Sequence, residues 1–220
     1  MFDLLNHQVI LWGIPMSIVD IIGSIMGIIY IILEYKASKW LWPACVIMGI
    51  CIAYSCFTNK LYANGAINVY YVLMAFYGIY TWQRMRRLQK QGHPEAVVDE
   101  APMQSMPRQY LPWVLISVAL LTAVLFFILK ALGEFTVVRG VNLALLDALT
   151  SSISIMAMWM LAKKYYQQWI GWIIVDPIAV VLFFLSGNYP LAIMYAFYVI
   201  ISVMGYCRWK REYHQTQTAQ

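Results

Sequence analysis

Residues 112–132 read PWVLISVALLTAVLFFILKAL, and Lys130 is the only charged residue in this stretch. A helix that crosses a bilayer needs about 20 predominantly apolar residues, so this stretch is long enough to be one. The whole chain has the same character. It has 62% hydrophobic and 11% charged residues, whereas roughly a quarter of the residues in a soluble domain are charged. We therefore expect an integral membrane protein.

Six further apolar stretches of similar length flank this one, three on each side. They cover residues 16–35, 40–57, 66–83, 143–162, 169–187 and 189–207. None of them alternates between apolar and polar residues with the period of two that a transmembrane β-barrel requires. The sequence thus predicts an all-α integral membrane fold with seven transmembrane helices.

Three segments lie outside these stretches. Residues 1–15 are too short to span a bilayer and mix apolar with polar side chains, so we interpret them as an interfacial helix, with a disordered tail as the alternative. Residues 85–111 contain three prolines and three acidic residues, and we expect a flexible cytoplasmic linker there. We expect residues 212–220 to form a cytoplasmic tail.

Basic residues gather after the first, third, fifth and seventh predicted helices. They are Lys36, Lys39, Arg84, Arg86, Arg87, Lys90, Lys163, Lys164, Arg208, Lys210 and Arg211. The positive-inside rule makes these helix ends cytoplasmic, which places the N-terminus outside and the C-terminus in the cytoplasm. Because the charges lie at helix ends, we do not interpret the net charge of +5 as nucleic-acid binding. We expect a multi-pass protein in contact with the lipid of a bacterial-type inner membrane.

The cysteines and histidines give no sign of a metal site. All four cysteines lie within or at the end of predicted helices, and all three histidines lie outside them. We therefore expect no disulfide, metal or cofactor. The phosphate-binding motif GxxxxGK[ST] and the hydrolase motifs GxSxG and HExxH are absent from the sequence. Their absence argues against direct use of ATP and against an intramembrane hydrolase, and we predict no catalytic residue.

The three predicted helices before residues 112–132 resemble the three after them. When residues 20–84 are set against the residues 127 positions later, identical Asp, Lys, Trp, Phe, Tyr, Gly and Arg residues coincide without a gap. The pairs are Asp20–Asp147, Lys36–Lys163, Trp42–Trp169, Phe57–Phe184, Tyr62–Tyr189, Tyr71–Tyr198, Gly78–Gly205, Trp82–Trp209 and Arg84–Arg211. Chance alignment is the alternative.

Because each triplet has three helices, the single helix between them gives both triplets the same orientation. The first triplet covers residues 16–84, the joining helix residues 112–132, and the second triplet residues 143–211. This predicts a 3+1+3 parallel repeat. Some transporters are built on such repeats and bind their substrate near the membrane midplane, between the repeats.

The predicted helix over residues 169–187 carries the strongest candidate site. Trp169, Trp172 and Asp176 follow the spacing i, i+3, i+7, so they share one helix face. An ionisable group this deep in a membrane helix usually faces the bundle interior or a wet cavity. Two indoles beside a carboxylate can stack on a flat, cationic ring. An interfacial aromatic belt for Trp169 and a helix–helix hydrogen bond for Asp176 are the alternatives.

Polar aromatic stripes occupy the third and seventh predicted helices. Asn68 and Tyr71 lie on the third, and Tyr195 and Tyr198 lie on the seventh, just after Asn188. Side chains of this kind can bind a ligand that has hydroxyl and amide groups.

Other matched residues are expected to have structural roles. Gly78 and Gly205 are expected to allow close helix contact, and Trp82 and Trp209 to anchor the chain in the interfacial belt. Asp20 and Asp147 are expected to cap helix starts, with a gate or ion site as the alternative.

Three of these patterns together resemble the PnuC family of nicotinamide riboside transporters. They are Trp169-x-x-Trp172-x-x-x-Asp176, Asn188 … Tyr195-x-x-Tyr198 … Gly205 … Trp209, and Asn68-x-x-Tyr71 … Gly78 … Trp82. The resemblance extends from about residue 20 to 211. It implies a fold similar to that of SWEET sugar transporters, assembled as a homotrimer. It also implies uptake of nicotinamide riboside by facilitated diffusion, followed by trapping through a cytoplasmic kinase.

The resemblance also assigns the binding residues. Trp169 and Trp172 would flank the nicotinamide ring. The amide and ribose would be surrounded by Asn188, Tyr195, Tyr198, Asp176, Asn68 and Tyr71. In the first triplet, Cys45 replaces the second tryptophan and Pro43 follows Trp42, so the two triplets should not bind alike.

Other functions remain open at this stage. Related proteins are thought to carry riboflavin or thiamine, and a SWEET-like sugar carrier is the nearest other transporter. A non-transporting membrane receptor or scaffold would lack a central polar site. An intramembrane enzyme would need a nucleophile and base that the sequence does not present.

Overall fold

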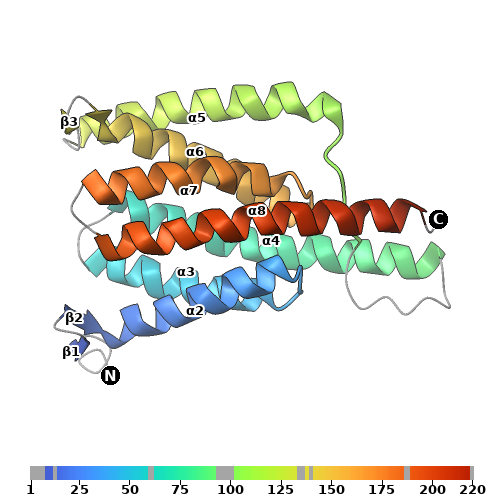
Figure 1. Ribbon diagram of the computed structural model, residues 1–220, viewed down its shortest axis with the longest axis horizontal. Coiled ribbons are helices and arrows are strands. Elements are labelled where there is room, and N and C mark those ends of the chain that lie inside the picture. The colour runs from blue at the N-terminus through green and yellow to red at the C-terminus, as the bar shows by residue number, and fades with distance from the viewer. Residues whose placement is uncertain are drawn as a thin grey trace. The chain divides into compact units, whose positions relative to one another are not determined.

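The computed structural model describes residues 8–11, 14–58, 62–92, 102–132, 137–138, 141–185 and 189–218. It divides the chain into two compact units, Met1–Glu100 and Ala101–Gln220, each of which is described by itself. Long helices dominate both units (Figure 1).

The first unit begins with two short antiparallel strands and continues with three helices. Strand β1 (Gln8–Leu11) pairs with β2 (Ile14–Ser17), so that Gln8 lies opposite Ser17. The helices are α2 (Ile18–Tyr35), α3 (Leu41–Thr58) and α4 (Tyr62–Gly92). Helix α3 packs against both of its neighbours.

The strands correct the expectation of a helix over residues 1–15. Val9 and Ile10 are β-branched and favour strands, and Gly13 and Pro15 are poor helix formers. Residues 1–7 lie outside the described part of the chain. The interfacial position of this segment remains a prediction.

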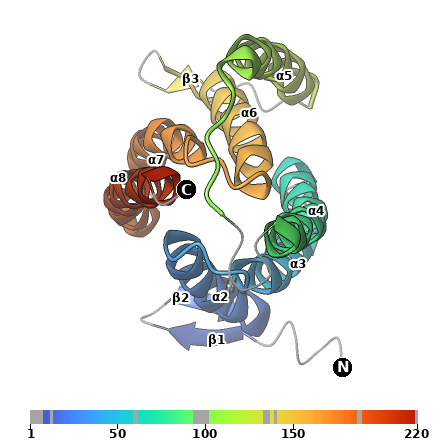
Figure 2. The same cartoon turned by 90° about the vertical axis from the view of Figure 1, so that its right-hand side faces the viewer.

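The second unit contains four long helices. After a short 3-10 turn, η1 (Arg108–Tyr110), come α5 (Leu111–Ala131), α6 (Leu143–Ala162), α7 (Gln168–Leu185) and α8 (Tyr189–Thr218). Two-residue strands β3 (Val137–Val138) and β4 (Val141–Asn142) pair just before α6. Helix α7 packs between α6 and α8, and α5 lies beside α6 (Figure 2).

The seven long helices agree with the seven predicted stretches. In the described part of the chain, four helical stretches are long and apolar enough to cross a membrane: Leu41–Thr58, Arg108–Ala131, Leu143–Ala162 and Ala192–Thr218. The side chains of α5 are largely exposed, including Trp113, Leu120 and Phe127. Such an apolar surface suits contact with lipid. The chain is thus an all-helical, multi-pass membrane protein, while the crossings of α2, α4 and α7 remain predictions.

The bounds of the helices recur in the two triplets. Helices α3 and α7 begin and end at positions 127 residues apart, as do the start of α4 and α8 and the end of α2 and α6. The first turn of each triplet also recurs, since Ala37 has φ 55° and Lys164 has φ 57°. In each case the following residue donates a backbone hydrogen bond five residues back, Ser38 to Leu33 and Tyr165 to Met160. This is the Schellman ending of a helix, with Ala or Lys where glycine is usual.

The expected linker over residues 85–111 is shorter and more ordered than predicted. Helix α4 continues to Gly92. Beyond the undescribed residues 93–101, a strap of residues 102–107 docks on the α6–α7 turn. The Gln104 N–H donates to the Lys164 carbonyl at 3.0 Å, and the Met106 N–H donates to Gln167 Oε1 at 3.0 Å. A flexible linker is therefore the wrong description of both ends of this segment.

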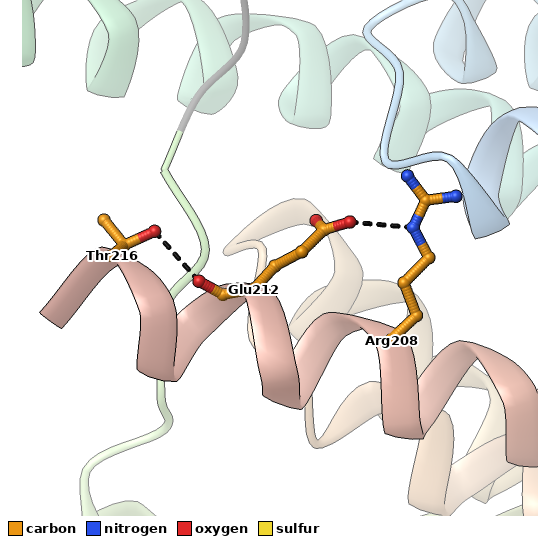
Figure 3. A network of polar contacts seen from close by, with 3 residues as sticks. All are labelled: Arg208, Glu212 and Thr216. Atoms are coloured by element: carbon orange, nitrogen blue, oxygen red, sulfur yellow. Dashed lines mark hydrogen bonds and ion pairs between the residues drawn. The ribbon is translucent and has the colours of Figure 1, made fainter. Parts of the chain in front are cut away.

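The expected tail from residue 212 is also helical as far as Thr218. Arg208 Nε donates to Glu212 Oε1 at 2.7 Å, and Thr216 Oγ1 donates to the Glu212 carbonyl at 2.9 Å (Figure 3). Pairs of this i, i+4 kind stabilise a helix by about 0.2–0.5 kcal/mol. They help α8 to continue beyond its apolar part.

Helix α6 starts differently from the prediction. Asn142 is its N-cap, and Asn142 Oδ1 accepts a hydrogen bond from the Leu145 N–H at 3.1 Å. Asp147 lies in the second turn and is therefore not the cap. Asp20 likewise lies inside α2, which begins at Ile18.

Candidate functional site

A buried carboxyl group marks the middle of the second triplet. Asp176 lies on α7 and is 4% exposed. The Ser202 hydroxyl on α8 donates a hydrogen bond to Asp176 Oδ2 at 2.6 Å. Pro177 follows Asp176 inside the helix and has no N–H to donate, so the hydrogen-bond ladder of α7 is interrupted beside the carboxyl group. Asp176 thus faces the neighbouring helix, as expected for an ionisable group in an apolar span.

Two of the predicted tyrosines join this carboxyl group. Tyr195 and Tyr198 lie on α8 with their ring centroids 5.5 Å apart and their planes at 70°. The Tyr195 hydroxyl is within electrostatic range of Asp176 and Asp147. Tyr195, Tyr198 and Ser202 follow the spacing i, i+3, i+7, so they share one face of α8. We call Asp176, Tyr195, Tyr198 and Ser202 the polar cluster.

Ser202 is the member of the polar cluster that the sequence reasoning missed. It is 1% exposed and lies one turn beyond Tyr198. Its position on the Tyr195–Tyr198 stripe was a usable signal, but a serine in an apolar helix more often bonds its own backbone. Only the packing of α8 on α7 pairs its hydroxyl with a carboxylate.

The paired tryptophans of α7 have different environments. Trp169 is fully buried, and its ring contacts that of Trp209 edge to face at 5.7 Å. A Cβ atom at Gly205 would overlap the Trp169 indole, so the glycine makes room for this ring. Trp172 is only partly buried. Trp169 therefore holds α7 against α8, and Trp172 is the more accessible indole.

The first triplet repeats this aromatic arrangement. Trp42 and Trp82 meet edge to face at 5.3 Å, and a Cβ atom at Gly78 would overlap the Trp42 ring. The expectation of close helix contact at both glycines is confirmed. The expectation that Trp82 and Trp209 are belt anchors is wrong, because they are 3% and 0% exposed and pack inside their own units.

Asn68 and Tyr71 lie in the first unit, on α4, and both are partly buried. The Tyr71 carbonyl accepts a weak hydrogen bond from Cys45 Sγ at 3.8 Å. Tyr71 also belongs to a group of interacting side chains that includes Tyr30 and Glu34. The sequence reasoning did not single out Glu34, although a carboxyl group within a predicted span is itself a signal. It is 1% exposed.

The structure thus brings Asp176, Tyr195 and Tyr198 together in the second unit. Asn188 lies outside the described residues, and its predicted role stays a prediction. The four cysteines are free thiols, and the described residues contain no group of three His, Cys, Asp or Glu side chains that could hold a metal ion.

Comparison with known proteins places this arrangement among transporters. A family model described as "Nicotinamide mononucleotide transporter" matches residues 17–211. The chain is 26% identical over 216 residues to the nicotinamide riboside transporter PnuC of Escherichia coli (strain K12), covering 90% of this chain and 87% of that protein. It is 23% identical over 210 residues to the riboflavin/roseoflavin transporter RibM of Streptomyces davaonensis, covering 93% of this chain and 87% of that protein.

A solved structure supports the fold. The crystal structure of the vitamin B3 transporter PnuC matches this chain with a TM-score of 0.65 and 23% sequence identity. The match covers 88% of this chain and 81% of that chain.

Proposed function

Because the chain belongs to the nicotinamide mononucleotide transporter family, we propose that it carries nicotinamide riboside across a bacterial inner membrane by facilitated diffusion. The polar cluster between α7 and α8 is the observation that carries this proposal. A buried carboxyl group with tyrosine and serine hydroxyls, set between apolar helices, suits a small polar substrate inside a membrane protein.

The chemistry of the cluster matches that of the riboside. Nicotinamide riboside has a cationic pyridinium ring, a carboxamide and ribose hydroxyls. The Asp176 carboxylate and the faces of Trp172, Tyr195 and Tyr198 favour a cationic ring. Hydroxyl groups can bond the ribose. A carboxylate repels phosphate, so the cluster favours the riboside over the mononucleotide.

Several finer features belong to the same proposal. We infer a 3+1+3 parallel repeat of SWEET type, alternating access, a homotrimer, and trapping of the product by a cytoplasmic kinase. The recurrence of helix bounds 127 residues apart supports the repeat. In this proposal Trp169, Asn188, Asn68 and Tyr71 also belong to the substrate site, with the N-terminus outside and the C-terminus in the cytoplasm.

A riboflavin transporter is the second candidate. The similarity to RibM covers nearly the whole chain, so a second vitamin with a flat ring must be tested. Riboflavin is larger and uncharged, and the Asp176 carboxylate therefore favours the cationic riboside.

Uptake by proteoliposomes tests the proposal. We expect purified protein to admit labelled nicotinamide riboside without an ion gradient and to accumulate it when a riboside kinase is enclosed. Trp172→Ala should lower the initial rate of uptake at least tenfold, because aromatic stacking is worth about 1–3 kcal/mol. Trp113→Ala is the matched control, since Trp113 is 67% exposed on α5 and should not contribute to binding.

The outcomes separate function from site. Uptake by the Trp172 variant at the unaltered rate would move the site elsewhere but keep the function. Folded protein that admits riboflavin and not nicotinamide riboside would overturn the substrate assignment.

A further inference from the structure

The start of α7 contains a buried amide side chain that neither the sequence reasoning nor the polar cluster uses. Gln168 is 0% exposed. Neither its Nε2 nor its Oε1 has a hydrogen-bond partner among the residues that the structure describes. Leaving a buried polar group unpaired costs about 1–3 kcal/mol for each group. A side chain kept at such a cost needs an explanation.

The equivalent position in the first triplet shows that packing does not require an amide. Leu41 lies 127 positions before Gln168, starts α3 as Gln168 starts α7, and is also 0% exposed. Leucine and glutamine have similar volumes. An apolar side chain therefore fills this place in one triplet, and the second triplet has an amide there for another reason.

The unpaired polar atoms around Gln168 gather on one side of α7. Besides the two amide atoms, the indole Nε1 atoms of Trp169 and Trp172 are buried and lack a hydrogen-bond acceptor in the described structure. Gln168, Trp172 and Asp176 follow the spacing i, i+4, i+8, so they form one stripe along the helix. The stripe leads from Gln168 past the accessible indole to the carboxyl group of the polar cluster.

We propose that Gln168 is a specificity-determining residue that pairs with the carboxamide of the substrate. A primary amide offers one acceptor and two donors. Two such groups side by side form two complementary hydrogen bonds, which satisfy both Nε2 and Oε1. The proposal rests on the proposed transport of nicotinamide riboside and names the group of this chain that reads the substituent of its ring.

Binding measured on purified protein tests the proposal. The variant is Gln168→Leu, which installs the residue of the first triplet. The ligands are nicotinamide riboside and the 3-acetylpyridine riboside, which has the same ring charge and a carbonyl group but no amide N–H. Isothermal titration gives both dissociation constants, and thermal unfolding shows that each protein is folded.

We expect the unaltered protein to prefer the carboxamide ligand about tenfold or more, since sites that bond a substrate N–H reject analogues without it. In Gln168→Leu, affinity for nicotinamide riboside should fall roughly tenfold to a hundredfold and the preference should disappear. The melting temperature should stay the same or rise, because an unpaired amide has been removed. Thr122→Val is the matched control. It removes a buried, unpaired hydroxyl from α5 and should leave both affinities unchanged.

Each failure has a distinct signature. Unchanged affinities in folded Gln168→Leu would overturn the role of Gln168 and leave the transported substrate intact. An equal loss for both ligands would overturn carboxamide pairing and place the amide elsewhere on the ligand. No binding of nicotinamide riboside by the unaltered protein would overturn the proposed function, and the role of Gln168 with it.

Discussion

The first triplet (α2, α3, α4) and the second triplet (α6, α7, α8) share a framework but differ in chemistry. Both have a middle helix of the same length, a left-handed residue after the first helix, and two tryptophans packed edge to face over a glycine. The residues that carry polar groups are not shared. Leu41, Cys45, Gly49 and Ala75 stand where the second triplet has Gln168, Trp172, Asp176 and Ser202.

The glycine at position 49 shows what this difference means for packing. A Cβ atom there would lie 2.7 Å from Val72 Cγ2, so α3 and α4 close on each other. At the equivalent place α7 and α8 enclose the hydrogen-bonded pair of Asp176 and Ser202. The comparison indicates that the repeated framework is structural, and that the second triplet supplies most of the candidate site.

Removing the shared framework should have the largest effect. Gly78→Ala and Gly205→Ala each place a Cβ atom inside a buried indole ring, and we expect each to lower the free energy of unfolding by at least about 2 kcal/mol. Thermal unfolding of the purified variants measures this. Gly27→Ala is the control, because the nearest atom to its Cβ, Met48 Sδ, is at an ordinary 3.5 Å. A large loss at one glycine only would mean that the two triplets do not share this framework.

Removing the charge of the second triplet should affect binding more than folding. In Asp176→Asn, the amide oxygen can still accept from Ser202, but the attraction for a cationic ring is gone. We expect affinity for nicotinamide riboside to fall about tenfold, which is about 1.4 kcal/mol and within the range for a partly screened charge pair. Titration calorimetry measures it. Glu212→Gln removes a carboxylate from the polar end of α8 and should change nothing (Figure 3). Equal affinities for Asp176→Asn and the unaltered protein would remove the carboxylate from the site.

The smallest effect is expected at the turn of the first triplet. Ala37 has φ 55°, which costs an L-residue about 1–2 kcal/mol and costs glycine nothing. Glycine loses more backbone entropy on folding, so we expect Ala37→Gly to stabilise the protein by about 0.5–1 kcal/mol. The melting temperature checks this. Ala44→Gly, inside α3, should destabilise by a similar amount. A loss of stability at both positions would show that the left-handed turn is not strained.

The sequence allowed the helices to be predicted more accurately than the segments between them. The seven apolar stretches match the seven long helices because run length and hydrophobicity are local properties. The hairpin of β1 and β2 and the docked strap of residues 102–107 were missed. Their stability depends on backbone hydrogen bonds to other segments, such as that from Gln104 to Lys164, which composition does not reveal.

The candidate site was predicted in part, for a similar reason. The spacing along α7 and α8 identified Asp176, Tyr195 and Tyr198, which the structure brings together. It did not identify Ser202 as the partner of Asp176, nor Glu34 and Gln168 as buried polar residues. It also placed Trp82 and Trp209 at the interface, because a tryptophan beside an arginine at a helix end is the usual sign of a belt.

The sequence by itself therefore determined membrane residence, the number and extent of the helices, and the recurrence 127 residues apart. These follow from composition and from the length an apolar helix needs in a bilayer. Only the tertiary structure decided that Ser202 meets Asp176 and that Trp169 fills the space above Gly205. Such contacts join residues 26 or more positions apart, and they depend on how closely two helices approach rather than on either helix alone.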